Sequence, residues 1–312
     1  MNVLVTGGAG FIGSHVVDLL AGLGHRVLVV DNLITGRMEN LGAKRENVMF
    51  EDTDISYPFA HPFVDADAAL FEPEVILHLA AQASITVSNE NPKFDLQTNG
   101  LGTLNVIMIA KQLGVRRIVM ASTSAVYGDE DVLLRESNVP SPMSPYGVSK
   151  LAGENYLRAM FPESVILRLG NVYGPRQVSI GENQVMARMI GHVLHGKDFS
   201  IHGDGNQKRD FVYVEDVAKA FHVGMVVEPG IYNIASGRGV SVNGVAAVLA
   251  RVMGQDVKWA HDEIKDTRRN VRMDVSKARA GMNWGAEVKL EEGLRRTVAF
   301  SSELLAVSEQ TL

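Results

Sequence analysis

The chain has 312 residues, a formal net charge of −6 and a hydrophobic fraction of 46%, which is enough for a sizeable core. It contains no cysteine, which excludes disulfides, thiolate metal sites and cysteine catalysis. The acidic balance, without basic tracts, argues against nucleic acid and anionic membranes as partners. Because Met1 leads directly into a strand pattern, with no secretory leader and no apolar run of spanning length, we expect a cytoplasmic protein with no membrane partner.

The first predicted element is an apolar strand at Val3–Thr6, followed by a glycine-rich turn and an amphipathic run through Leu23. Strand, glycine turn and helix, in that order, are the context that a dinucleotide-binding fingerprint requires. We expect Gly7 to make the tight turn, Gly10 to let the backbone approach a pyrophosphate, and Gly13 to let the helix close on the sheet. The start of the helix would then offer unpaired N–H groups to the phosphates.

A second strand pattern over Val27–Val30 ends in Asp31, at about the spacing of an acid that binds the adenosine ribose hydroxyls. A carboxylate at this point repels a 2′-phosphate and therefore favours NAD over NADP. Arg37 follows closely enough to keep NADP open as an alternative.

Short apolar runs continue to alternate with longer helical patterns. The expected strands are Val3–Thr6, Val27–Val30, Val48–Glu51, Val75–Leu79, Arg117–Ser122 and Val165–Leu169. Strands separated by helices predict an α/β fold with a doubly wound parallel sheet of the Rossmann type, which binds ligands at the carboxyl ends of its strands. Beyond Leu169 the pattern becomes irregular and rich in glycine turns. We therefore expect a cofactor-binding domain over 1–169 and a smaller α/β substrate-binding domain over 170–312.

The strongest chemical signal lies between Thr123 and Lys150. Tyr146 and Lys150 are four residues apart, so a helix places both on one face, and Ser144 and Pro145 form a good helix start. A cation beside a tyrosine favours the phenolate, and lowering its pKa from about 10 to about 7 takes about 4 kcal/mol. We predict Tyr146 as a base and Lys150 as the cation that lowers its pKa. Such a pair alone is usually a surface feature, so the prediction depends on the glycine loop.

Taken together, these regions resemble the extended short-chain dehydrogenase/reductases, the family of nucleotide-sugar 4-epimerases and 4,6-dehydratases. Matching stretches follow the family's order over nearly the whole chain. They are Thr6–Gly13, Asp31–Leu33, Asp54–Ile55, His78–Gln82, Asn99, Ser122–Gly128, Tyr146–Lys150, Asn171–Arg176 and Arg209–Tyr213. The resemblance also implies that 209–226 folds back onto the first domain.

The resemblance implies NAD as cofactor and assigns catalytic roles. The implied cofactor residues are Gly7, Gly10, Phe11, Ile12, Gly13, Asp31, Asn32, Asp54, Ile55, Leu79, Ala80, Ala81, Asn99, Tyr146 and Lys150. Thr123 occupies the position of the family's catalytic hydroxyl, which hydrogen-bonds the reacting sugar oxygen. In the implied reaction Tyr146 takes the proton from the sugar O4 while hydride passes from C4 to NAD, and Lys150 also holds the nicotinamide ribose.

The two residues after Thr123 separate the subfamilies. The 4,6-dehydratases carry Asp-Glu there, and UDP-glucuronate decarboxylases generally carry Glu at the second position, whereas this chain has Ser124 and Ala125. We therefore expect reversible C4 epimerisation, with UDP-glucose, UDP-galactose or their N-acetyl forms as first candidates. A lyase, either a dehydratase or a decarboxylase, remains an alternative. A non-catalytic NAD-sensing relative is a third, against which the retained Tyr146 and Lys150 count.

Substrate contacts are implied more weakly, and the nucleobase and sugar stay open. The implied substrate residues are Ser124, Asn171, His202, Arg209 and Arg269. Of these, Asn171 and Arg209 match diphosphate binders, and His202 stands where relatives place an aromatic against the base. The family's usual motif near the C-terminus is missing here, so Arg269 is taken as the C-terminal diphosphate-binding residue, with Lys265 and Arg268 as alternatives. The nine histidines show no metal-ligand spacing, so no metal is expected.

The family also implies a homodimer, formed by a four-helix interface between the helix of 99–110, the helix of Tyr146 and their symmetry mates. The apolar positions available for it are Leu101, Leu104, Ile107, Met108, Leu151, Tyr156 and Leu157. The same positions suit packing within one chain, so the sequence leaves the oligomeric state open.

Overall fold

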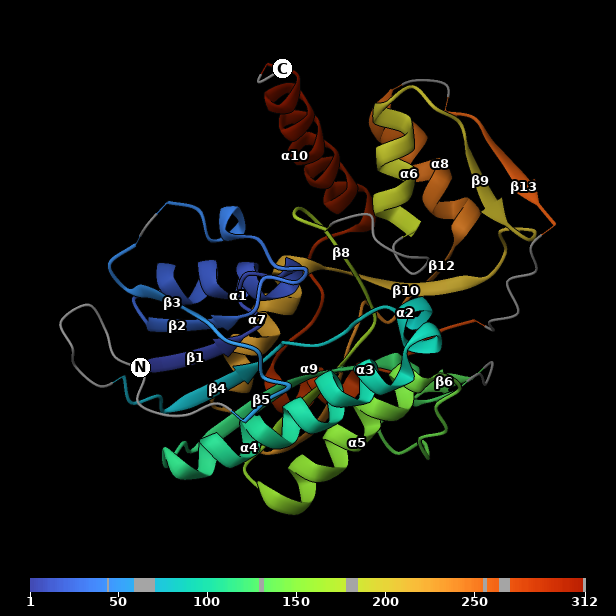
Figure 1. The fold of residues 1–312 in the computed structure, drawn as a ribbon. Helices are drawn as coiled ribbons and strands as arrows, with labels where there is room; N and C mark the ends of the chain where they lie inside the picture. Colours follow the sequence, from blue (N-terminus) through green and yellow to red (C-terminus); the bar gives the residue numbers. More distant parts are fainter. Residues whose placement is uncertain are drawn as a thin grey trace.

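A parallel sheet of seven strands, in the order β11-β7-β5-β4-β1-β2-β3, forms the centre of the computed structural model (Figure 1). The structure describes residues 1–43, 45–58, 71–128, 132–177, 185–254, 257–263 and 270–310. Within those ranges, every helix is too short or too polar to span a lipid bilayer. The strands are β1 (Asn2–Thr6), β2 (Arg26–Asp31), β3 (Val48–Asp52), β4 (Val75–His78), β5 (Arg117–Thr123), β7 (Val165–Leu169) and β11 (Gly230–Ile234).

The predicted fold class is confirmed, and six of these strands match the predicted runs. The seventh, β11, comes from the second half of the chain and pairs with β7 in parallel, from Gly230 opposite Val165 to Ile234 opposite Leu169. The sequence did not predict it, because Ile231 to Ile234 is a short run that lies beyond the regular alternation of strands and helices. The sheet is therefore completed by a segment that lies far along the chain.

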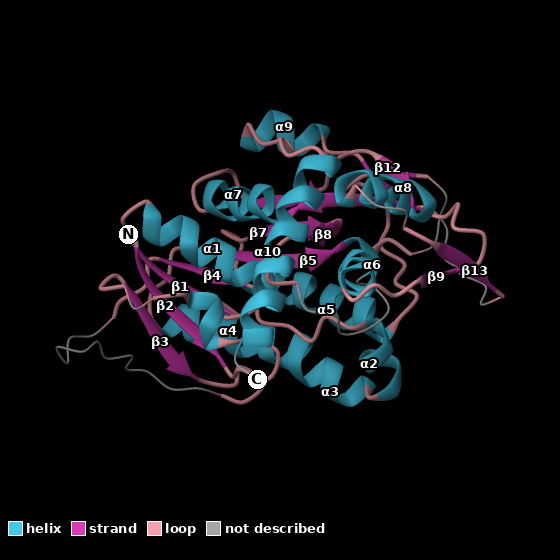
Figure 2. Cartoon of the chain, turned by 90° about the horizontal axis from the view of Figure 1, so that it is seen from above, coloured by secondary structure: helices cyan, strands magenta, loops and turns pink. Residues whose placement is uncertain are grey.

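Helices cover both faces of the sheet, as the view from above shows (Figure 2). Val3 and Val5 of β1 face α1 (Phe11–Gly22) and α7 (Val214–Gly224), whereas Leu4 faces α4 (Gly102–Gln112) and α5 (Pro145–Met160). Alternate side chains of one strand thus enter two separate cores, which explains why the strand sequences are continuously apolar. The implied return of 209–226 corresponds to β10 and α7, and Phe221 of α7 shares a core with Val17 of α1.

The remaining elements build a smaller layer beside the sheet. Strands β8 (Asn171–Tyr173), β10 (Lys208–Tyr213) and β12 (Gly239–Ser241) form one small sheet, and β9 (Phe199–His202) pairs with β13 (Trp259–Asp262). Their apolar side chains pack with α6 (Val185–Leu194), α8 (Val242–Met253) and α10 (Leu290–Gln310). Strand β6 (Leu133–Leu134) pairs with β14 (Arg272–Met273), and α9 (Ser276–Met282) contributes to the core beside α7. Short helices are η1 (Met38–Leu41), α2 (Ile85–Glu90), α3 (Pro92–Leu96) and η3 (Ser124–Val126), and a π-helical turn, η2 (Gln97–Leu101), joins α3 to α4.

A buried ion pair fixes α5 to the sheet. Arg168 of β7 is 2% exposed, and its Nη2 lies 2.6 Å from Oε2 of Glu154, which is 1% exposed. The Ser122 hydroxyl donates to the same carboxylate, and the guanidinium lies over the Tyr127 ring, 4.6 Å from its centroid. Removing one member of such a pair leaves the other charge uncompensated inside the protein.

We expect Arg168→Met to lower the free energy of unfolding by about 3–5 kcal/mol, because Glu154 would stay buried without its cation. The double variant Glu154→Leu/Arg168→Met should recover most of this loss, since an apolar pair of similar size needs no desolvation of charge. Urea unfolding of the two variants and the wild type measures both effects. A single variant as stable as the wild type would contradict this account of the pair.

Candidate active site

The glycine loop after β1 has contacts that exclude side chains. Gly7 has a φ of +71°, and a Cβ there would lie 2.5 Å from the backbone N of Ala80. A Cβ on Gly13 would lie 2.0 Å from the carbonyl oxygen of Gly7, so the close contact at Gly13 is with the glycine turn itself. Gly10 is less crowded, because its nearest neighbour would be 3.2 Å away. The turn can therefore keep this backbone conformation only with glycine at Gly7 and Gly13.

The N-terminus of α1 fits a bound phosphate. Gly10 is its N-cap in an extended conformation, and among the described residues no side chain caps the helix. The first-turn N–H groups at Phe11 and Ile12 therefore point out of the helix end together with its positive dipole. This is the arrangement that binds the pyrophosphate of a dinucleotide.

Asp31 stands at the carboxyl end of β2, where it is 7% exposed. Its Oδ2 accepts from the N–H of Ala9 at 3.0 Å, and its Oδ1 accepts from the N–H of Leu33 at 2.9 Å. Burial raises the pKa of this carboxyl, against the lowering effect of these hydrogen bonds. Each oxygen keeps acceptor capacity for a further hydroxyl, which fits the predicted contact to a ribose.

The other predicted cofactor residues lie at the same carboxyl edge of the sheet. Asn32 follows Asp31, and the segment from Leu79 to Ala81 follows β4, with the Ala80 N–H donating to the Thr6 hydroxyl at 3.3 Å. The Asp54 carboxylate accepts from the N–H of Ser56 at 2.8 Å, and Ile55 is buried next to it. The structure therefore places these residues in one region, as the sequence predicts.

His78 at the end of β4 is a neutral structural residue. The Thr103 hydroxyl donates to the Asn99 carbonyl at 2.6 Å, so it accepts from Nε2 of His78 at 2.9 Å. Nδ1 then accepts from the Thr6 hydroxyl at 2.8 Å. Burial, and to a smaller extent the charge of Lys150, lower the pKa of His78 to about 3. The imidazole thus joins β1, β4 and α4 without taking part in proton transfer.

The three predicted catalytic residues lie together where β5 ends and α5 begins. Thr123 is the last residue of β5, and a hydrogen bond joins its side chain to that of Tyr146. Helix α5 starts as predicted, with Ser144 accepting from the Gly147 N–H at 3.1 Å and Pro145 in the first turn. Lys150 follows one turn later and is 2% exposed.

The pKa of Tyr146 differs from the sequence-based expectation. Burial raises it to about 12, and the charge of Asp95 adds to this effect, although the bond to Thr123 lowers it. Burial lowers the pKa of Lys150 to about 8, against the opposing effect of Glu154 and Asp95. We expected the pKa of Tyr146 to be lowered. Among the described residues, however, desolvation raises it by more than the favourable contacts lower it.

The predicted substrate residues are only partly brought together. Ser124 follows Thr123 in η3, and Asn171 begins β8, two residues after Leu169, the neighbour of Thr123 in the sheet. Arg209 lies on β10 and is 8% exposed. His202 lies on β9, where its Nδ1 is 2.8 Å from a carboxylate oxygen of Asp262, which occupies that nitrogen. Arg269 lies outside the described residues, as do Lys265 and Arg268.

The sequence analysis missed a buried polar layer next to Tyr146 and Lys150. The Nδ2 of Asn99 donates to Asp95 at 3.1 Å and to the Gln82 carbonyl at 2.9 Å, and it also lies 3.1 Å from the Ser149 hydroxyl. Oδ1 of the same side chain accepts from the Gln82 N–H at 2.9 Å. A sequence signal existed, since Asp95 and Asn99 are four residues apart. The carboxamide of Asn99 is thus engaged with protein groups.

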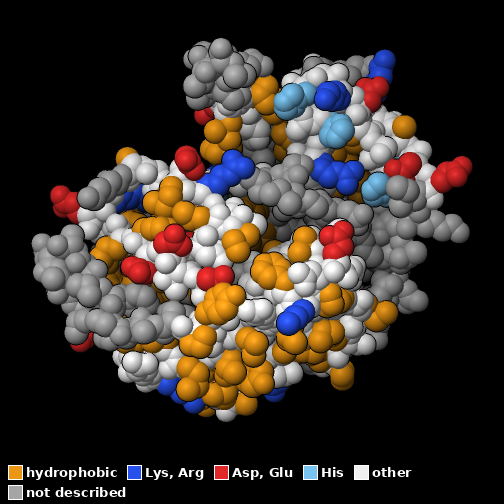
Figure 3. All heavy atoms as spheres, in the orientation of Figure 1, with side chains coloured by type: hydrophobic (Ala, Val, Ile, Leu, Met, Phe, Trp, Pro, Cys, Tyr) orange, Lys and Arg blue, Asp and Glu red, His pale blue; other side chains and the backbone are white. Residues whose placement is uncertain are grey.

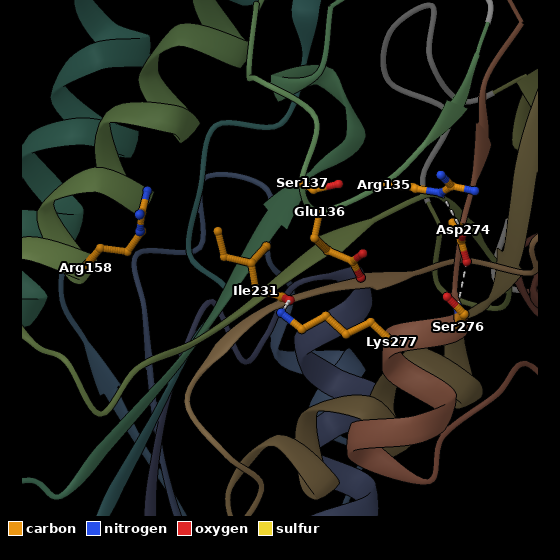
Figure 4. A pocket seen from close by; sticks show the side chains of 8 residues that line it. All are labelled: Arg135, Glu136, Ser137, Arg158, Ile231, Asp274, Ser276 and Lys277. Carbon is orange, nitrogen blue, oxygen red and sulfur yellow. Dashed lines mark hydrogen bonds and ion pairs between the residues drawn. The ribbon is translucent and has the colours of Figure 1, made fainter.

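One surface hollow of about 710 Å³ is separate from these residues (Figure 4). It is lined by Arg135, Glu136, Ser137, Arg158, Ile231, Asp274, Ser276 and Lys277. Several of its charged groups are paired within the protein, such as Arg135 with Asp274 at 3.1 Å and Lys277 with the Ile231 carbonyl at 2.7 Å. None of the three predicted catalytic residues lines it.

The described parts of the chain also hold no cluster of three His, Asp or Glu side chains that could bind a metal ion.

Comparison with known proteins decides the family. The model of the NAD-dependent epimerase/dehydratase family matches residues 3–235. The chain belongs to this family. A putative UDP-glucose 4-epimerase from Methanocaldococcus jannaschii is 38% identical over 95% of this chain and 97% of its own length. A UDP-glucuronic acid decarboxylase from Arabidopsis thaliana is 32% identical over 99% of this chain and 72% of its own.

Solved structures agree with this assignment. The UDP-glucose 4-epimerase of Thermotoga maritima, determined with UDP-glucose, superposes with a TM-score of 0.89 at 38% identity, over 98% of this chain and all of the other. The UDP-glucose 4-epimerase of Thermus thermophilus, determined with NAD, has a TM-score of 0.84 at 38% identity, over 96% and 98% of the two chains. The predicted family, and NAD as its cofactor, are confirmed.

We expect Gly13→Ala to remove NAD from the purified protein, because its Cβ would collide with the Gly7 carbonyl and displace the phosphate-binding turn. Gly22→Ala is the matched control, since it changes the same helix at a position where a Cβ meets no atom within 4 Å. Nicotinamide nucleotide released by denaturation, together with binding of added NAD, measures the effect. Equal NAD content in both variants would contradict the role given to Gly13.

Proposed function

We propose that this protein is an NAD-dependent 4-epimerase of a UDP-linked sugar. The observation that carries the proposal is the assembly of Thr123, Tyr146 and Lys150 at the carboxyl edge of the sheet, followed by Ser124 and Ala125 instead of acids. Inverting a carbon through a ketone needs one base, one hydride acceptor and no second carboxylate. The similar epimerases from M. jannaschii and T. maritima support the same reaction.

In this proposal Tyr146 removes the proton from the sugar O4 and later returns it, while Thr123 hydrogen-bonds the same oxygen. When bound, NAD supplies the oxidising and reducing chemistry by accepting hydride from C4 and giving it back. Because the pKa of Tyr146 is about 12 in the protein alone, the phenol keeps its proton at neutral pH. A positive charge next to the ring would lower that pKa, so we expect Tyr146 to act as a base only with the oxidised cofactor beside it.

A lyase is the second candidate, because the similar proteins include a UDP-glucuronic acid decarboxylase. Such reactions in the resembled enzymes use a carboxylate next to the catalytic threonine. Among the described residues, the carboxylates that act electrostatically on the catalytic pair are Asp95 and Glu154, and both are buried and hydrogen-bonded within the protein. Their engagement inside the protein favours the epimerase.

For the substrate we propose that Ser124, Asn171, His202, Arg209 and Arg269 bind the nucleotide sugar, with residues 170–312 as the substrate domain. Glucose, galactose or their N-acetyl forms are the proposed sugars. The Arg209 guanidinium is suited to the diphosphate because it offers several donors in a fixed plane.

We further propose a homodimer built on α4 and α5. Hydrophobic side chains gather over this part of the surface (Figure 3), and Leu101, Met108 and Tyr156 are 50%, 55% and 43% exposed. Ile107 and Leu157, which the sequence analysis had grouped with them, are instead fully buried in the core of their own chain. Exposed apolar positions on two neighbouring helices are typical of an interface.

Incubation with UDP-glucose or UDP-galactose should give the same mixture of both sugars from either side, because epimerisation is reversible and causes no net redox change. The N-acetyl forms are tested in parallel. NMR of the products measures the composition. A product that has lost water or carbon dioxide would contradict the proposed epimerisation and show that the enzyme is a lyase.

We expect Tyr146→Phe to lower the rate by at least about 100-fold, the low end for general acid–base catalysis, and to leave NAD bound. Thr123→Ala should have a smaller effect if neighbouring hydroxyls or water substitute for it. Rates from the same assay, with NAD content as the control for folding, distinguish the two roles. Full activity of Tyr146→Phe would disprove the mechanism.

Multi-angle light scattering at micromolar concentration should give twice the mass of one chain. The variant Met108→Glu/Tyr156→Glu should be monomeric, because it places charges on the proposed interface, whereas Leu304→Glu changes an exposed residue of α10 and should leave the dimer intact. A monomeric wild type would exclude the interface.

A further inference from the structure

One buried carboxylate has no role in the chemistry proposed above. Asp95 lies on α3 with none of its surface exposed. Its Oδ1 accepts from Nε2 of Gln82 at 2.7 Å and from Nδ2 of Asn99 at 3.1 Å. Its Oδ2 is equally buried and has no hydrogen-bond partner among the described residues. An unpartnered oxygen of a buried carboxylate costs free energy, so packing alone does not explain an acid here.

The same residue is connected to the helix that carries the catalytic pair, and α3 lies beside α5 in both ribbon views (Figures 1 and 2). The Asn99 amide that donates to Asp95 also lies 3.1 Å from the Ser149 hydroxyl. Ser149 lies between Tyr146 and Lys150 and donates to the Tyr146 carbonyl at 3.0 Å. A short chain of hydrogen bonds therefore leads from Asp95 to the first turn of α5.

Lys150 needs a counter-charge, because an ammonium that is 2% exposed has lost almost all its water. Two carboxylates act on it electrostatically, Glu154 and Asp95. Glu154 has the larger effect of the two, but it also forms the buried pair with Arg168, so its charge is shared between two cations. His78 is neutral and cannot contribute a charge of either sign.

We propose that Asp95 is a positioning residue of the active site, whose carboxylate supplies the fixed negative charge that balances the buried ammonium of Lys150. The proposal rests on the roles proposed for Tyr146 and Lys150. The proposal explains why Asp95, with one unpartnered oxygen, is buried in this layer. The favourable interaction between its charge and that of Lys150 offsets the free energy that its burial costs.

The charge has a defined effect on both catalytic groups. Asp95 raises the pKa of Tyr146, because it disfavours the phenolate, and it raises the pKa of Lys150, because it favours the ammonium. Removing the charge should lower both pKa values. We expect kcat/KM to show a bell-shaped pH dependence, in which the acid limb reports formation of the Tyr146 phenolate and the basic limb reports loss of the Lys150 ammonium. Without the charge of Asp95, both limbs should move to lower pH.

Asp95→Asn isolates this effect. The amide oxygen can still accept from Gln82 and Asn99, so the variant loses the charge and keeps the two hydrogen bonds. In the NAD-bound enzyme, with UDP-glucose as substrate, we expect both limbs of kcat/KM to move to lower pH by about 0.5 unit or more. Glu90→Gln is the matched control, since it removes an exposed carboxylate from the neighbouring helix α2 and should shift neither limb.

A second measurement does not depend on activity. Ultraviolet absorbance of the phenolate, titrated in the NAD-bound protein, should move to lower pH in Asp95→Asn. Subtracting the same titration of a Tyr146→Phe version isolates Tyr146 from the other tyrosines among the seven. If Asp95→Asn does not fold, Asp95→Ser removes the same charge and leaves room for a water between Gln82 and Asn99.

A variant that loses activity by the same factor at every pH, with an unshifted phenolate titration, would overturn the proposal and leave Asp95 as a structural residue. Failure of the proposed function gives a different result. A wild-type protein that does not interconvert the sugars would disprove the epimerase, whereas the absorbance titration needs no sugar and still decides the role of Asp95.

Discussion

The position of Tyr146 and Lys150 depends on buried polar contacts that hold α5. On one side Glu154 binds Arg168 of β7, and on the other Ser149 contacts Asn99 of the π-helical turn. Ser149 and Glu154 lie on α5 three and eight residues after Tyr146, so a displacement of α5 would move Tyr146 away from Thr123. Apolar packing alone fixes a helix less exactly, because it has no direction, whereas these bonds have defined partners and geometry. The relative position of Tyr146 and Thr123 is thus fixed by contacts within the protein.

The same buried surroundings explain the chemistry of Tyr146. The sequence suggested that Lys150 would lower the pKa of the tyrosine, whereas in the structure burial raises it to about 12. Desolvation acts on both groups and disfavours the charged form of each. In the proposed mechanism, Tyr146 would therefore lose its proton only when the positive charge of the oxidised cofactor lies beside it.

Much of the fold and part of the site could be predicted from the sequence, for physical reasons. Strands such as Val3–Thr6 are continuously apolar because both faces are buried, and the loop from Gly7 to Gly13 is specified by contacts that only glycine allows. What could not be predicted depends on contacts between distant segments. Asp95 has the spacing of an ordinary helix residue, and its burial becomes apparent only when α3 packs on α5. The partner of His202, Asp262, becomes its neighbour only through the pairing of β9 with β13.

Strand β11 has a consequence for how this chain can be divided or synthesised. It covers the edge of β7, yet it follows β7 by more than sixty residues along the chain. A nascent or truncated chain that ends before Gly230 would leave the buried, apolar β7 as an open edge with unpaired backbone groups, which invites pairing with other chains. The cofactor-binding part therefore cannot be isolated by cutting after residue 169. During synthesis its sheet stays incomplete until β11, which ends at Ile234, has left the ribosome.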